Sequence, residues 1–125
     1  MPLRTFLVED DEHIRTVLSE LMRTVADISI IGHATTEISA MTWLVSEPNE
    51  WDLAVIDLML ASGSGLRVLS GCRVRQHRQK MVVLTNHATK EMRRRCADLG
   101  ADAVFDKATE TEQLLEYCTD LRRRA

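Results

Sequence analysis

The strongest constraint on the fold is an alternation of short apolar runs with longer segments that repeat apolar residues at helical spacing. Each of five runs is too short for a helix and is followed by a segment whose apolar residues recur every three or four positions. This alternation predicts an α/β fold: a five-stranded parallel sheet, right-handed crossovers and helices on both faces. The runs are residues 3–8, 28–32, 53–57, 81–85 and 103–105.

The five segments that follow the runs are expected to be helices. Pro48 should stop the second and Gly100 should end the fourth, whereas Gly71 weakens the third near its end. The apolar positions of the five segments are Ile14, Val17, Leu18, Leu21 and Val25; Ile38, Met41, Leu44 and Val45; Leu66, Val68 and Leu69; Met92, Cys96 and Leu99; and Leu114, Leu115, Cys118 and Leu121.

Size and charge narrow the class of protein. The chain has 125 residues, 45% of them hydrophobic, which predicts one compact domain over residues 1–125. A net charge of −3 gives no reason to expect direct nucleic-acid binding, and no stretch is long and apolar enough for membrane insertion. The three cysteines are widely spaced and form no C-x-x-C pair, which is typical of reduced packing residues. We therefore expect a cytoplasmic protein.

Acidic residues follow two of the predicted strands. Glu9, Asp10 and Asp11 come directly after the first, and Asp57 ends the third. In a parallel sheet these strand ends meet at one edge, where ligands bind in folds of this kind. Mg²⁺ is typically held by one or two carboxylates and phosphate oxygens. The sequence therefore predicts an Mg²⁺ site at Asp10 and Asp57, with Glu9 reaching through a water and the backbone carbonyl of Met59 as a further ligand.

Two more polar residues belong to the same edge. Thr85 ends the fourth predicted strand and Lys107 follows the fifth. A carboxylate beside Mg²⁺ can attack phosphorus and form an aspartyl phosphate, which makes Asp57 the candidate phosphoacceptor. Lys107 would contact the phosphoryl group as a point charge and Thr85 would donate a hydrogen bond to it. Taken singly, each residue is more simply a turn, cap or surface residue; their joint placement favours the site.

Four motifs in this order resemble a response-regulator receiver domain over essentially the whole chain. They are residues 8–15 (VEDDEHIR), 55–60 (VIDLML), 83–85 (VLT) and 100–107 (GADAVFDK). The resemblance implies the flavodoxin-like strand order 2-1-3-4-5. It also implies that a sensor histidine kinase or a histidine phosphotransfer protein donates the phosphoryl group to Asp57. By position, Glu9 and Asp10 match the family's acidic pair, Thr85 its switch hydroxyl residue and Lys107 its phosphate-contacting lysine. Asp11 falls one place beyond the pair and should belong to the loop or helix cap.

Three positions depart from the family pattern. Ala108 stands where a proline usually follows the lysine, so that a cis bond before it would cost about 2.5–4 kcal/mol. Val104 occupies the position of the aromatic switch residue, and Phe105 should point to the opposite face of the sheet. Ala61 replaces a proline, which should give residues 61–65 more freedom. Gly65 stands where the family commonly has a glycine. The departures concern output more than the acceptor chemistry.

We expect a stand-alone switch rather than an enzyme, with at most slow self-dephosphorylation. Its output would go to an unknown downstream protein, or to a homodimer formed through the fourth helix, fifth strand and last helix. The alternative is a binding or scaffold module that works without phosphorylation. A phosphohydrolase of the haloacid-dehalogenase type is disfavoured, because Met59 occupies the position of its second acid. No phosphate-binding glycine motif of a nucleotide-binding enzyme occurs.

Overall fold

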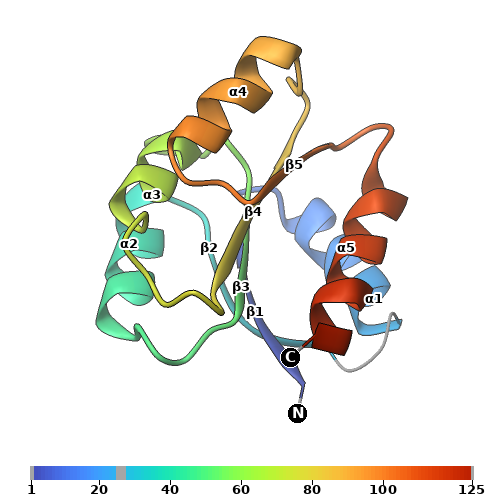
Figure 1. The fold of residues 1–125 in the computed structure, drawn as a ribbon. Coiled ribbons are helices and arrows are strands. Elements are labelled where there is room, and N and C mark those ends of the chain that lie inside the picture. The colour runs from blue at the N-terminus through green and yellow to red at the C-terminus, as the bar shows by residue number, and fades with distance from the viewer. Residues whose placement is uncertain (1, 25–27, 125) are drawn as a thin grey trace.

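A computed structural model describes residues 2–24 and 28–124, and it shows a five-stranded parallel sheet in the order β2-β1-β3-β4-β5 (Figure 1). The predicted fold class and strand order are confirmed. The strands are β1 (Leu3–Val8), β2 (Ile28–Ala34), β3 (Leu53–Ile56), β4 (Lys80–Thr85) and β5 (Ala103–Asp106). The helices are α1 (Glu12–Thr24), α2 (Glu37–Ser46), α3 (Gly65–Gly71), α4 (Lys90–Asp98) and α5 (Thr111–Arg124).

The register of the strands brings their carboxyl ends to one edge of the sheet. Val8 at the end of β1 is opposite Ile56 at the end of β3, and Ile56 is opposite Val83 in β4. At the far side, Thr85 of β4 is opposite Asp106 of β5. The residues that follow these positions therefore leave the sheet side by side, as the sequence predicts.

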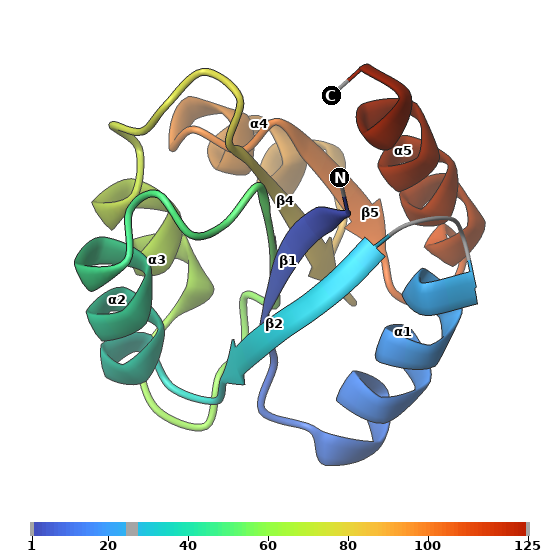
Figure 2. The same ribbon diagram turned by 90° about the horizontal axis from the view of Figure 1, so that it is seen from below.

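The alternating side chains of the strands build one core on each face of the sheet. Helices α2, α3 and α4 cover one face, and α1 and α5 cover the other, as Figures 1 and 2 show. In β1, Phe6 points to the first core and Leu7 to the second. This alternation is the period of two of a β-strand, and burial on both faces explains why the central strands are almost wholly apolar.

The apolar faces of two helices were predicted too broadly. In α1 the buried residues are Leu18 and Met22, whereas Val17 is 42% exposed. In α2, Ile38 and Val45 are 77% and 58% exposed, so the prediction that they face the core is wrong. A helix lying on a sheet buries only a narrow stripe, and apolar residues on its flanks remain in contact with solvent. Val25, which was predicted to continue the α1 stripe, lies outside the described residues.

The ends of the elements agree closely with the sequence signals. Gly100, which follows the C-cap of α4, has a φ of 106°, a conformation that favours glycine at the end of a helix. Strand β2 continues to Ala34, two residues beyond the predicted run. Within the described ranges, no helix combines the length and the apolar character that a membrane span requires.

Candidate phosphoacceptor and metal site

Asp57 lies at the centre of the carboxyl edge, in the first position after β3. Its backbone N–H donates to the carbonyl of Val8 at 2.8 Å, and the residue is only 6% exposed. Gly65 packs directly against the backbone of Asp57: a Cβ on Gly65 would lie 2.1 Å from the Asp57 carbonyl oxygen. The glycine is thus required by the close approach of two backbone segments, which fixes the backbone at Asp57, the candidate phosphoacceptor.

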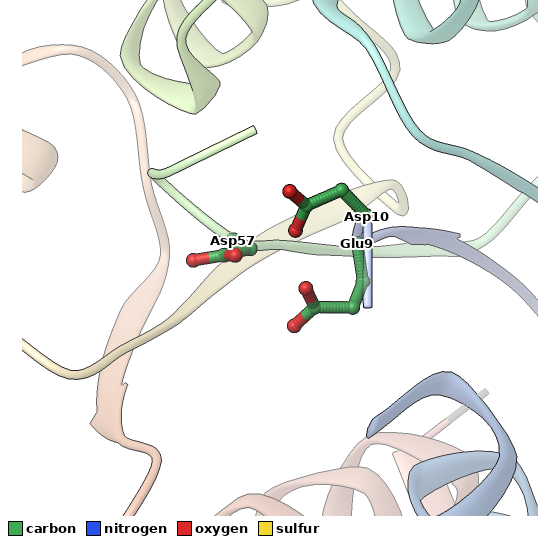
Figure 3. Close-up of side chains that lie close together, drawn as sticks. All are labelled: Glu9, Asp10 and Asp57. Atoms are coloured by element: carbon green, nitrogen blue, oxygen red, sulfur yellow. The ribbon is translucent and has the colours of Figure 1, made fainter. Parts of the chain in front are cut away.

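Glu9 and Asp10 follow β1 beside Asp57. The Glu9 N–H donates to the Ala34 carbonyl at 3.0 Å, and Glu9 is 4% exposed, whereas Asp10 is exposed. One carboxylate oxygen from each of the three acids lies within 4.8 Å of the others (Figure 3). The structure therefore brings together the carboxylates that the sequence assigned to a metal site.

Asp11, the third acid of the run, does not join the cluster. Its side-chain oxygen accepts a hydrogen bond from the N–H of Ile14 at 3.0 Å, as an N-cap residue does at the start of a helix. The interpretation of Asp11 as a cap is confirmed. Its own N–H donates to the Glu9 carboxylate at 3.2 Å, so the cap also helps to hold that acid.

Lys107 neutralises part of the buried charge. Its Nζ lies 2.6 Å from Glu9 Oε1 and 3.1 Å from Asp57 Oδ2. Burial opposes the charged form of the ammonium group, but the two carboxylates outweigh burial and the pKa of Lys107 is raised. Burial raises the pKa of the Glu9 carboxyl to about 7, although the hydrogen bond with Lys107 acts in the opposite direction. Lys107 therefore stays charged near neutral pH, and Glu9 is the member of the pair whose protonation changes near neutral pH.

Thr85 is fully buried at the end of β4, next to the loop that carries Lys107. Its carbonyl accepts a hydrogen bond from the Lys107 N–H at 2.9 Å, which ties the ends of β4 and β5 together. The Thr85 hydroxyl oxygen accepts from the N–H of His87 at 3.1 Å. A hydroxyl that accepts one hydrogen bond still has its own proton to donate, as a phosphate contact requires. The His87 side chain is exposed at the rim.

Met59 lies three residues after the end of β3. Its N–H donates to Asp57 Oδ1 at 3.2 Å, and its side chain extends outward, with the residue 66% exposed. The peptide bond between Lys107 and Ala108 is trans, and Asp106 Oδ1 accepts from the N–H of Ala108 at 2.8 Å. A side-chain acceptor thus shapes this loop where the family usually has a proline.

The expected freedom of residues 61–65 is not what the structure shows. Ser64 N–H donates to a carboxylate oxygen of Glu37 at 2.9 Å, and the Glu37 N–H donates to the Ser62 carbonyl at 3.0 Å. The loop is therefore tied to the start of α2 at two points. Sequence reasoning missed Glu37, because it lies 27 positions before Ser64 and nothing local signals the contact.

Arg15 is a second residue that the sequence reasoning left without a role. Its Nη1 donates to the Glu9 carbonyl at 2.8 Å, which braces the backbone of the acidic pair from α1. An arginine six positions after a glutamate carries no recognisable signal in the sequence, since the contact depends on how α1 begins.

Val104 and Phe105 of β5 point to opposite faces of the sheet, as the sequence predicts. Phe105 packs on the α1/α5 side, edge-on against Tyr117 with ring centroids 5.8 Å apart. Val104 packs with the core on the opposite face. The position of the family's aromatic switch therefore holds a small aliphatic side chain.

The site fits a divalent cation on the chemistry of its donors. Three carboxylates and one ammonium group leave a formal charge of −2 when all are ionised, and every donor that the cluster offers is oxygen, as Mg²⁺ prefers. Glu9, Asp10 and Asp57 are the side chains that would hold the ion, and the Met59 carbonyl is the further ligand that the sequence predicts. These metal-binding assignments, and the roles of Thr85 and Lys107, remain predictions.

A doubly wound parallel sheet with an acidic cluster and a lysine at its carboxyl edge defines a class: α/β signalling modules of the receiver type. Residues 5–119 match the response regulator receiver domain family. The chain belongs to this family, and it is a receiver domain of two-component response regulators.

Curated relatives of known sequence are similar over nearly the whole chain. Response regulator RppA of Synechocystis is 26% identical over 123 residues, which cover 98% of this chain and 52% of that protein. Response regulator protein VraR of Staphylococcus saprophyticus is 25% identical, with 93% of this chain and 54% of the relative covered. The chain spans about half the length of these curated relatives.

Solved structures share the fold at lower identity. A chain of the CheX–CheY–BeF3–Mg complex from Borrelia burgdorferi has a TM-score of 0.86 at 16% identity, with 98% of this chain and 90% of that chain covered. The receiver domain of NarL from Mycobacterium tuberculosis has a TM-score of 0.83 at 14% identity, with 98% and 97% covered. These likenesses confirm the architecture.

Proposed function

We propose that this protein is a phosphorylation-dependent switch in which Asp57 accepts a phosphoryl group. The observation that carries the proposal is the pairing of Lys107 with Asp57 and Glu9 inside a cluster of three carboxylates. Such a cluster is unfavourable without a cation, and a bound Mg²⁺ would neutralise charge on the phosphoryl oxygens during transfer.

The donor would be a phosphohistidine of a sensor histidine kinase or of a histidine phosphotransfer protein. An Asp57 carboxylate oxygen attacks phosphorus, and the P–N bond to the imidazole breaks. The electron pair of that bond stays on the imidazole nitrogen, which is then protonated. Lys107 would hold the phosphoryl group by charge and the Thr85 hydroxyl would donate to it, which draws the β4–α4 and β5–α5 loops toward Asp57.

A groove beside the site supports a protein donor. The groove has a volume of about 220 Å³, lies between α1 and α5, and is lined by Ile14, Val17, Leu21 and Lys107 among others. Apolar side chains that stay partly exposed next to a phosphorylation site suit a helical partner that must bring its histidine close to Asp57.

Output would pass to an unknown downstream protein or to a second copy of the chain, in the cytoplasm. A homodimer through α4, β5 and α5 is supported by exposed arginines on α4 (Arg94 and Arg95) and exposed glutamates on α5 (Glu112 and Glu116). The protein would not be an enzyme in the usual sense, since the phosphoryl group stays on its own side chain and leaves only by slow self-dephosphorylation.

The test is the intact mass after incubation with acetyl phosphate, with and without Mg²⁺. The wild type is expected to gain one labile phosphoryl group only when Mg²⁺ is present, and Asp57→Asn to gain none. Asp11→Asn is the matched control, because Asp11 caps α1 outside the cluster. A wild type that gains no mass with Mg²⁺ would refute the proposal and favour a module that binds its partner without phosphorylation.

A further inference from the structure

The loop after the acceptor strand doubles back on itself beside Asp57. Met59 and Ser64 form an antiparallel bridge, and the Gly65 N–H donates to the Leu58 carbonyl at 3.1 Å. The backbone at Met59, which carries the predicted carbonyl ligand, is therefore positioned by two contacts: its bridge to Ser64 and the hydrogen bond of its N–H to Asp57 Oδ1.

Ser64 is held by a residue from another part of the chain. Glu37, the first residue of α2, accepts the Ser64 N–H at 2.9 Å through Oε1, and its own N–H donates to the Ser62 carbonyl. Gly63 between them has a φ of 85°, and a Cβ there would lie 2.3 Å from Glu37 Cβ. The loop thus packs directly against the Glu37 side chain, with no room for a side chain at Gly63.

We propose that Glu37 is a positioning residue for the divalent cation: it fixes Ser64 and, through the Ser64–Met59 bridge, aims the Met59 carbonyl at the acidic cluster. The inference rests on the proposed function, because it assumes that the cluster binds Mg²⁺. Mg²⁺ demands nearly ideal octahedral geometry, so a small displacement of one ligand lowers affinity. Residues that orient ligands without touching the metal typically change affinity 10–100-fold when removed.

The alternative is that Glu37 acts only through its charge, as an acid in the first turn of α2 and near a cation site. Two substitutions separate hydrogen bonding from charge. Glu37→Gln removes the charge but keeps an Oε1 that can accept from Ser64. Glu37→Asp keeps the charge but is one methylene too short to reach it.

The experiment is Mg²⁺ titration by calorimetry on the wild type and on the two variants, with MgCl₂ as the only ligand. We expect Glu37→Asp to weaken Mg²⁺ binding about tenfold and Glu37→Gln to stay within about twofold of the wild type. Phosphorylation by acetyl phosphate should distinguish the two variants in the same way. In Glu37→Asp the Mg²⁺ concentration for half-maximal rate should rise, while the rate at saturating Mg²⁺ should stay near that of the wild type.

Each of the other outcomes refutes either the proposed function or the role of Glu37. If the wild type binds no Mg²⁺, the proposed function fails. If the wild type binds Mg²⁺ and Glu37→Asp binds it equally well, only the role of Glu37 is refuted. Weakening in Glu37→Gln but not in Glu37→Asp would assign the effect to charge and refute positioning. Thermal unfolding in EDTA checks that both variants fold, and Glu37→Ala should repeat the result of Glu37→Asp if the shorter acid is not tolerated.

Discussion

Arg93 of α4 and Glu110, the residue before α5, form an ion pair that joins the two loops leaving the candidate site. The same guanidinium donates to the carbonyl of Ala88 at 3.0 Å and to that of Val104 at 2.9 Å. Ala88 lies three residues after Thr85, and Glu110 lies three residues after Lys107. One side chain thus clamps both segments that begin at the predicted phosphate contacts, in a chain whose Val104 replaces the aromatic switch.

Arg93→Ala should loosen both loops. We expect a loss of unfolding free energy of about 1–2 kcal/mol, because two backbone carbonyls lose a charged donor. Amide hydrogen exchange should accelerate at residues 86–89 and 106–110 and stay unchanged in β1. Arg94→Ala is the control, since Arg94 is an exposed neighbour on the same helix. Equal exchange in the two variants would contradict the clamp.

Gly65→Ala should destabilise the protein by about 3 kcal/mol and block phosphorylation. The new Cβ would lie 2.1 Å from the Asp57 carbonyl oxygen and 2.8 Å from Leu58 Cα, and backbone atoms cannot move aside without displacing the acceptor. Urea denaturation with the mass assay measures both effects.

Gly71→Ala is the matched control for this glycine. There the Cβ would meet the terminal methyl of Met41 at 2.4 Å, and a flexible side chain can turn away. Alanine is also favoured over glycine within a helix, so stability should stay within about 1 kcal/mol of the wild type. Similar losses of unfolding free energy in the two alanine variants would show that the backbone contact of Gly65 does not require a glycine.

Magnesium should stabilise the fold through the acidic cluster. At a concentration one hundred times its Kd, a ligand that binds only the native state adds about 2.7 kcal/mol. Asp10→Asn should abolish the rise in Tm while leaving the EDTA value almost unchanged, because Asp10 is exposed and the ion pairs of Lys107 involve Glu9 and Asp57 instead. A full Mg²⁺-dependent rise in Asp10→Asn would remove Asp10 from the site.

Asp52 should make stability depend on pH at the other end of the sheet. It accepts hydrogen bonds from the Arg4 backbone at 2.8 Å and from the Arg4 and Arg78 side chains. Burial would raise the pKa of Asp52, but the hydrogen bonds and charge of Arg4 outweigh it and lower the pKa. A group whose pKa is lowered by folding stabilises the protein above its unfolded pKa of about 3.9, and the effect disappears as pH falls through the folded value.

Asp52→Asn is therefore expected to lose about 1–2 kcal/mol at pH 7 and progressively less below pH 4. Urea denaturation of both proteins between pH 2.5 and 7 measures the difference. A difference that stays constant over this range would show that the charge of Asp52 contributes nothing.

The strands and the acidic edge of the sheet could be predicted from the sequence, because they depend on residues that are close together in the chain. Runs such as residues 53–57 specify buried strands by composition alone, and parallel strands must place their carboxyl ends, with Glu9, Asp10 and Asp57, at one edge. Val104 and Phe105 point to opposite faces of the sheet, as expected because successive side chains of a strand alternate between the two faces.

The tertiary structure alone decided what depends on distant partners. Helical periodicity marks Val17 and Ile38 as apolar but does not say which flank of the helix meets the sheet, so their exposure was not predictable. Glu37 and Ser64 are far apart in sequence, as are Arg93 and Glu110. Such pairs come into contact only when the helices have packed on the sheet. The side-chain carboxylates then restrain loops whose amino-acid composition alone suggests conformational freedom.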